Sequence, residues 1–267
     1  MDTKGTKERA ALGAAVAMAC MATGGPAHAG LAKGTDGAPA PMFRISELRV
    51  DQQGADTDEY VEILGQAGSS LAGCWFVAIG DSGTDPGGVV EMAIDLSAWS
   101  LGSNGRFVAH EATFGGTAFD GRTLAADPAG AHAVIGTGDS LNFENSDSVT
   151  YMLVRSFSGT VGMDLDAGND GTLDAMPWKE LLDSVAFVRS NSTDPVYAAV
   201  RVGSVDLTAT GGMPPHAWFD GNGWQVGEYA SWMRDTPGGE PAVPAPGAVA
   251  TVAAALCTCI GRGRQRR

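Results

Sequence analysis

Short stretches of alternating apolar and polar residues recur along this 267-residue chain. In the first, "FRISELRV", apolar Phe43, Ile45, Leu48 and Val50 alternate with polar residues, with one slip. Eight stretches with strand character lie at 43–50, 59–64, 74–80, 89–96, 106–110, 149–157, 183–188 and 198–202, and several of them alternate in this way. A period of two is typical of strands, and Gly, Asp, Asn and Ser separate the stretches. The pattern therefore predicts an all-β sandwich or barrel.

One stretch favours a helix instead. "PWKELLDSV" has Pro177 where a first helical residue would lie, which predicts one or two helical turns. The Gly-, Ala- and Pro-containing residues 30–42 predict a flexible leader. Residues 43–240 are long enough for one domain with its own core.

The N-terminus has the pattern of an export signal. Three cations in the first nine residues precede an apolar run from Ala10 to Met21. Ala27 and Ala29 then form the A-x-A pattern of a signal-peptidase site. We expect residues 1–29 to be a signal peptide and the protein to be exported.

The C-terminus, residues 241–267, has a Pro-x-Pro start, a short apolar segment and a basic end. The apolar run from Ala248 to Ile260 is shorter than the ~20 residues that span a bilayer as a helix. The basic end consists of Arg262, Arg264, Arg266 and Arg267. Because such clusters stay on the cytoplasmic side, the tail is expected to hold the chain at the membrane.

This tail resembles the PEP-CTERM sorting signal of bacterial surface proteins. The resemblance rests on Val243, Pro244, Pro246 and the four terminal arginines, while Ala245 replaces the usual Glu. It implies an exosortase-like membrane enzyme as a processing partner. It also implies removal of the tail and delivery to the cell surface, outer envelope or extracellular matrix. The alternative is a plain tail anchor.

A second resemblance concerns residues 43–240. Ile45-Ser46-Glu47, the stretch from Asp58 to Ile63, and Thr236-Pro237-Gly238 are similar to bacterial lamin-tail-type domains. The resemblance implies an immunoglobulin-like β-sandwich, here with long loop insertions between about 115 and 171. It also implies a non-catalytic adhesion or interaction module whose partners are extracellular polysaccharide or surface proteins.

The net charge of the chain limits the classes of partner that the domain can bind. The formal net charge is -14. Without the two ends, 10 of 17 Lys and Arg and 29 of 31 Asp and Glu remain, so the net charge is about -19. This acidity excludes nucleic acid and anionic lipid as partners of the domain.

Within 43–240 the one cysteine is Cys74, in the apolar "CWFVAIG", where a buried, inert thiol is expected.

The stretch "GMDLDAGNDGTLDAMPWKE", residues 162–180, is a candidate calcium loop, and calcium is the one cofactor that the sequence suggests. Calcium takes six to eight oxygen ligands, which acidic side chains and carbonyls on a Gly-rich loop supply. The candidate ligands are Asp164, Asp166, Asp170, Asp174 and the carbonyl of Thr172. An EF-hand is excluded, because Pro177 takes the place of its last acid. The alternative is a solvated turn.

The sequence gives little support for a catalytic site. His110, His132 and His216 form no H-E-x-x-H motif, and surface or strand-end positions are expected for them. The aromatic cluster at 216–232 either fills the core or forms a sugar-binding surface. Two alternative functions therefore stay open beside the non-catalytic module. One is a calcium-dependent carbohydrate-binding module, and the other is a secreted metal-dependent hydrolase of polysaccharide or phosphoester.

Overall fold

The protein is all-β, with two mixed sheets. The computed structural model describes residues 43–82, 85–115, 126–138, 140–190, 193–203 and 212–241. These residues contain strands and connecting loops but no helix, and hence no helix that could cross a membrane. The strands are β1 (Arg44–Arg49), β2 (Tyr60–Leu64), β3 (Cys74–Ser82), β4 (Asp85–Asp95), β5 (Arg106–Glu111), β6 (Ala131–Ile135), β7 (Val149–Arg155), β8 (Glu180–Val188), β9 (Arg201–Gly203), β10 (His216–Phe219) and β11 (Trp224–Val226).

The first sheet has six strands in the order β11-β10-β1-β2-β5-β6. All its pairs are antiparallel except β5 with β6. The register of β1 against β2 shifts between Ile45 and Glu47, which places a bulge at Ser46. This bulge accounts for the slip in the alternation of the first stretch, because an extra residue shifts the following side chains to the other face.

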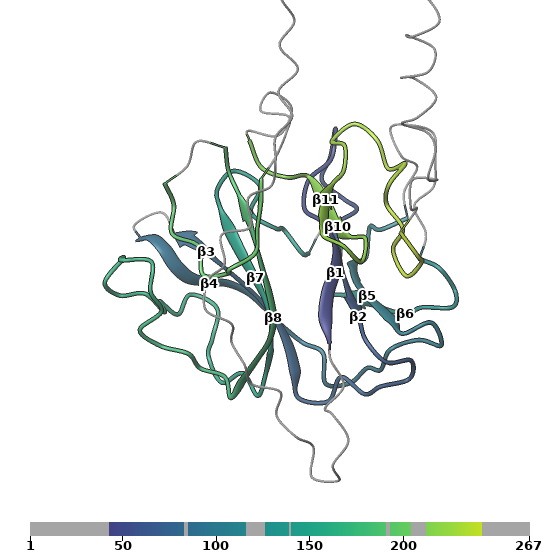
Figure 1. Cartoon of the computed structure of the whole chain (residues 1–267), viewed down its shortest axis with the longest axis horizontal. Helices are drawn as coiled ribbons and strands as arrows, with labels where there is room; N and C mark the ends of the chain where they lie inside the picture. The colour runs from purple at the N-terminus through teal and green to yellow at the C-terminus, as the bar shows by residue number, and fades with distance from the viewer. Residues whose placement is uncertain are drawn as a thin grey trace, which may run out of the picture.

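The second sheet has five strands in the order β4-β3-β7-β8-β9. Its pairs are antiparallel except β8 with β9. The two sheets lie on opposite sides of the molecule in Figure 1, with β3, β4, β7 and β8 in one and β1, β2, β5 and β6 in the other.

One large apolar core lies between the sheets. Ile45 and Leu48 of the first sheet belong to the same cluster as Phe76, Tyr151 and Phe187 of the second. The ring of Tyr151 stacks on Phe76 and meets Phe187 edge-on. Two sheets facing each other across a shared core are the arrangement of a β-sandwich.

The structure confirms all eight predicted strands, with shifted ends. It also confirms that Cys74 is a buried free thiol. The predicted helical turns from Pro177 are wrong, because β8 begins at Glu180 and pairs with β7. The pattern missed β6, β10 and β11, which have three to five residues each.

Candidate functional site: a buried polar network and a cavity

The outer face of the six-stranded sheet carries polar side chains that the end of the domain covers. Because side chains alternate along a strand, Glu47 and Arg49 of β1 lie on the face opposite Leu48. Residues 228–240, called the C-terminal segment here, run beside this sheet (Figure 1). Five side chains meet beneath it and are called the polar network: Glu47, Arg49, Tyr60, His216 and Asp235.

Arg49 joins β1 to the C-terminal segment with four of its five N–H groups. Its Nε donates to Asp235 Oδ2 at 2.8 Å, and its Nη2 donates to Asp235 Oδ1 at 2.5 Å. The remaining N–H groups donate to the carbonyls of Asp51, Glu228 and Ser231, each at 3.1 Å. A guanidinium has five donors, so this buried cation is fully hydrogen-bonded.

Glu47 accepts hydrogen bonds from three sides. Its Oε1 accepts from the Tyr60 hydroxyl at 2.6 Å and from the Thr236 backbone N–H at 2.8 Å. His216 Nε2 lies 2.9 Å from the same oxygen, and the Thr236 hydroxyl donates to Oε2 at 3.0 Å. The carboxylate thus connects β1, β2 and β10 to the C-terminal segment.

Burial sets the electrostatics of the polar network. Burial alone would raise the pKa of the Asp235 carboxyl, but the charges of His216 and Arg49 hold that pKa below its usual value. Burial also raises the pKa of the Tyr60 hydroxyl well above its ordinary value, with Asp235 and Glu47 acting in the same direction. Tyr60 is therefore a neutral donor, and the Arg49–Asp235 pair stays ionised.

A second buried ion pair, between Glu62 of β2 and Arg106 of β5, also contacts the C-terminal segment. Glu62 forms an ion pair with Arg106 and accepts from the Ser46 hydroxyl at 2.5 Å. It also accepts from the Gly238 backbone N–H at 2.7 Å. Burial and the charge of Glu47 raise the pKa of Glu62 to about 8, although Arg106 opposes this. The C-terminal segment is thus held to the sheet at Gly238 as well as at Asp235.

The polar network does not fit a metal ion. Glu47, His216 and Asp235 are the one group of three metal-ligating residues in the described chain whose ligand atoms all lie within 4.8 Å. However, both oxygens of Asp235 already bind Arg49, and Glu47 accepts four contacts. A cation there would displace a cation that is already paired. Because the three residues are at most 3% exposed, the network is also closed to a substrate.

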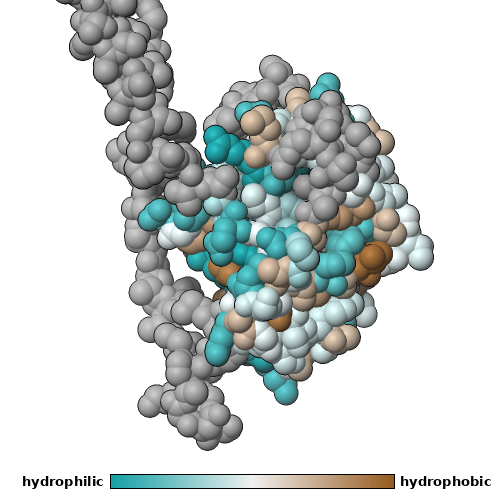
Figure 2. Space-filling model, turned by 90° about the vertical axis from the view of Figure 1, so that its right-hand side faces the viewer, coloured by the Kyte–Doolittle hydropathy of each residue, from teal (hydrophilic) through white to brown (hydrophobic). Residues whose placement is uncertain are grey.

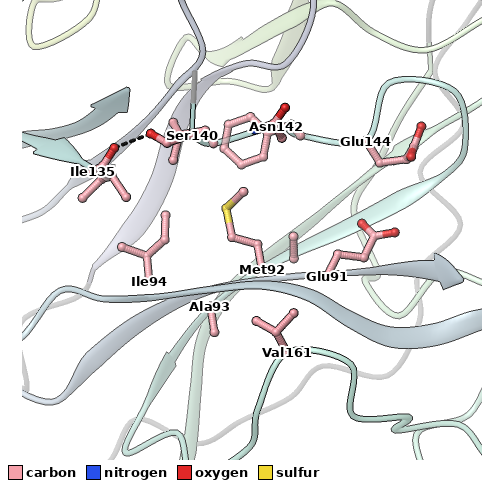
Figure 3. A pocket seen from close by; sticks show the side chains of 12 residues that line it. Glu91, Met92, Ala93, Ile94, Ile135, Ser140, Asn142, Glu144 and Val161 are labelled. Carbon is pink, nitrogen blue, oxygen red and sulfur yellow. Dashed lines mark hydrogen bonds between the residues drawn. The ribbon is translucent and has the colours of Figure 1, made fainter. Parts of the chain in front are cut away.

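A cavity of about 350 Å³ lies at edge strand β4 (Figure 3). Met92 and Ile94 of β4 form an apolar part, and Glu91 and Glu144 point into the same end. The other lining residues are Ala78, Ala93, Ile135, Ser140, Leu141, Asn142, Phe143 and Val161. Burial, followed by the charges of Glu144 and Asp81, raises the pKa of Glu91 to about 7. A carboxyl with such a pKa can give or take a proton near neutrality.

In the predicted calcium loop, the loop's own backbone donates hydrogen bonds to Asp166. Asp166 is buried, and its carboxylate accepts from the backbone N–H of Asp170 at 3.2 Å and of Gly171 at 2.9 Å. It also accepts from the Tyr197 hydroxyl at 2.9 Å. Burial would raise the pKa of Asp166, but these hydrogen bonds hold it below the usual value.

The other predicted ligands also bind the loop's own backbone. Asp164 accepts from Asp166 N–H, Asp170 from Thr172 N–H, and Asp174 from Gly168 N–H. These acids do not form a three-residue group of the kind found in the polar network. The geometry is that of an Asx-type turn, and the calcium site stays a prediction.

The other predicted residues divide into two groups. The signal residues Ala27 and Ala29 and the sorting residues Val243, Pro244, Pro246, Arg262, Arg264, Arg266 and Arg267 lie outside the described residues. Of the histidines, His132 is exposed, whereas His110 and His216 lie at strand ends but are buried. Each of the six tryptophans is buried or half-buried, and Trp232 packs against Tyr60 and Val108.

No sequence motif marks the polar network. Glu47 and Arg49 lie on the outer face of β1, as ordinary surface residues do, and Asp235, the partner of Arg49, is far away in the sequence. Comparison of the chain with protein-family models, curated proteins and solved structures finds no match. The structure therefore defines the class of the protein as an all-β, two-sheet domain with a polar network beneath its C-terminal segment.

Proposed function

We propose that the protein is a non-catalytic, exported β-sandwich module displayed at the cell surface, in the outer envelope or in the extracellular matrix. In this proposal the signal peptide directs export, and the tail holds the chain for an exosortase-like enzyme. The domain then presents its loops to extracellular polysaccharide or to other surface proteins. Its acidity makes nucleic acid an unsuitable partner.

The observation that carries the proposal is the contact between the two ends of the domain. The lamin-tail resemblance rests on residues near 45–63 and on Thr236-Pro237-Gly238. In the structure Glu47 binds Thr236, and Glu62 binds the Gly238 backbone. Motif residues that are far apart in sequence thus belong to one contact, which supports an immunoglobulin-like, lamin-tail-type sandwich.

The same contact suits a tail-sorted protein. Arg106 pairs with Glu240, and the proposed sorting motif begins three residues later at Val243. A tail joined to a fixed segment positions the domain close to the membrane while the tail is processed. On the face shown in Figure 2, apolar residues form small separate patches.

The test is the intact mass and cell fraction of the protein in its host. We expect a surface or extracellular form that starts after Ala29 and lacks Arg267. A variant with Pro244→Ala and Pro246→Ala should keep its tail and accumulate at the membrane, whereas a variant with Pro241→Ala should be processed normally. A surface form that still ends in Arg267 would refute tail removal, and a cytoplasmic form that keeps residues 1–29 would refute export.

The cavity favours one second candidate, a secreted hydrolase. A carboxyl with a pKa of about 7 beside another carboxylate suits a general acid, and Glu91 has this environment. Hydrolysis of a polysaccharide panel that is lost in Glu91→Gln and kept in Asp95→Asn would support it and refute the non-catalytic proposal. The carbohydrate-binding alternative has less support, because no tryptophan lies exposed for stacking on sugars.

A further inference from the structure

Two histidines lie side by side on the outer face of β5 and β6, and His110 lies opposite Tyr60 of β2 in the sheet. The parallel register pairs Val108 with His132 and His110 with Val134, so the two imidazoles lie on the same face, two positions apart. His110 Nε2 is 3.4 Å from His132 Nδ1, and the ring centroids are 5.6 Å apart.

The backbone fixes which nitrogen of His110 carries a proton. Its Nδ1 lies 2.8 Å from the carbonyl oxygen of Glu111, which can only accept a hydrogen bond. Nδ1 therefore carries the proton, and the lone pair of Nε2 points to His132. A histidine that binds a metal typically donates its other N–H to a carbonyl or carboxylate in this way.

The surroundings of His110 hold its ring in place. The ring of Phe114 packs against His110 with centroids 4.5 Å apart. Neutral imidazole is the form that binds metal ions, and a fixed ring loses little freedom on binding.

The distance between the two nitrogens suits a metal better than a hydrogen bond. An N–H···N contact of 3.4 Å is longer than a typical hydrogen bond of about 2.9–3.0 Å. Zinc–nitrogen bonds are about 2.0–2.1 Å, and at a tetrahedral angle they hold two nitrogens about 3.4 Å apart. The side chains are thus already spaced as two ligands of one ion.

We propose that His110 and His132 bind one divalent transition-metal ion that prefers imidazole, such as Zn²⁺ or Cu²⁺. His132 is exposed, so the ion reaches the pair from solvent and completes its coordination with water. Copper binds a given nitrogen site more tightly than zinc, whereas calcium prefers oxygen ligands and does not bind here. With two protein ligands, the site is weaker than a four-ligand structural zinc site.

The test uses the protein purified without a histidine tag, titrated calorimetrically with Zn²⁺, Cu²⁺ and Ca²⁺ at pH 7.5. We expect one Cu²⁺ or Zn²⁺ per chain, tighter for Cu²⁺, with no heat from this site for Ca²⁺. His132→Gln should weaken binding by roughly tenfold or more. Its metal-free Tm should stay unchanged, because the side chain is exposed. Val134→Ala, on the same strand and face, is the matched control and should bind normally.

Two outcomes would overturn the proposal. One is the absence of saturable Cu²⁺ and Zn²⁺ binding, and the other is equal binding by the unaltered protein and His132→Gln. An electron paramagnetic resonance spectrum of the Cu²⁺ form gives an independent check, because two imidazole nitrogens should produce nitrogen splitting that His132→Gln reduces. A spectrum that does not change in the variant would place the ion elsewhere.

Discussion

Replacing Asp235 by Asn should destabilise the domain far more than breaking an ion pair at the surface. The change removes the negative charge opposite Arg49, and both side chains are 0% exposed. Removing one partner of a buried pair leaves an uncompensated charge, which costs about 3–5 kcal/mol. For a domain of this size that corresponds to a fall in Tm of roughly 6–20 °C.

The matched control is Glu180→Gln, which breaks the Arg155–Glu180 pair. That pair also joins an arginine Nε to a carboxylate, at 3.1 Å, but its side chains are 30% and 32% exposed. Its loss should cost less than about 1 kcal/mol. The free energies of unfolding come from urea titrations followed by tryptophan fluorescence. An Asp235→Asn cost no larger than that of Glu180→Gln would refute the stabilising role of the polar network.

The same pair predicts a pH dependence with a definite sign. The folded-state pKa of Asp235 is lower than its unfolded value of about 3.9, so the folded state binds fewer protons. The stabilisation is therefore fully present above about pH 4 and is lost as pH falls through the folded-state pKa. The difference between the unaltered protein and Asp235→Asn should be constant from pH 5 to 7 and shrink below about pH 4.

Three further predictions concern other parts of the domain. Gly227→Ala should destabilise by about 1–3 kcal/mol, because its Cβ would collide with the His216 ring, whereas Gly223→Ala, with open space around it, should be nearly neutral in urea unfolding. Because the pKa of Glu91 is raised to about 7, the folded state keeps a proton that the unfolded state has lost. The free energy of unfolding should therefore fall by roughly 1–3 kcal/mol between about pH 4.5 and 7. Glu91→Gln should remove this fall in urea midpoints, and an unchanged fall would contradict the prediction. If the loop at 162–180 binds calcium, calcium at a hundredfold excess over Kd should add about 2.7 kcal/mol, lost with chelator or in Asp166→Asn, and identical melting with calcium and chelator would leave the loop a turn.

Local patterns predicted the sheets well where each strand is long enough to show its period. The first stretch shows this, since its slip corresponds to the bulge at Ser46. The pattern failed where tertiary contacts outweigh local preference. Pro177 favours a helix start, but pairing of Leu153 with Asp183 and of Val154 with Leu181 draws the following residues into β8. Strands of three residues, such as β11, are too short for a period to be seen.

The polar network was beyond prediction for a different reason. Arg49 and Asp235 are 186 positions apart, and each alone has the composition of a surface residue. Only the fold brings β10 beside β1 and places the C-terminal segment over both. The calcium site in the acid-rich loop at 162–180 stays a prediction, and the fold adds that Asp166 accepts hydrogen bonds from the loop's own backbone.

The polar network fixes the position of the C-terminal segment on the sheet more closely than apolar contacts alone would. The C-terminal segment forms no strand, so ladder hydrogen bonds do not fix its position on the sheet. Its one large apolar contact, Trp232 against Tyr60 and Val108, contributes burial but leaves its register loosely defined. Glu47 and Glu62, which lie opposite each other in the sheet, bind the backbone N–H groups of Thr236 and Gly238, two positions apart in the sequence. A shift of the segment by one residue would break both bonds and would also move Asp235 away from the buried Arg49, which is far more costly than sliding apolar surface. These contacts therefore fix the position of residues 235–238 on the sheet.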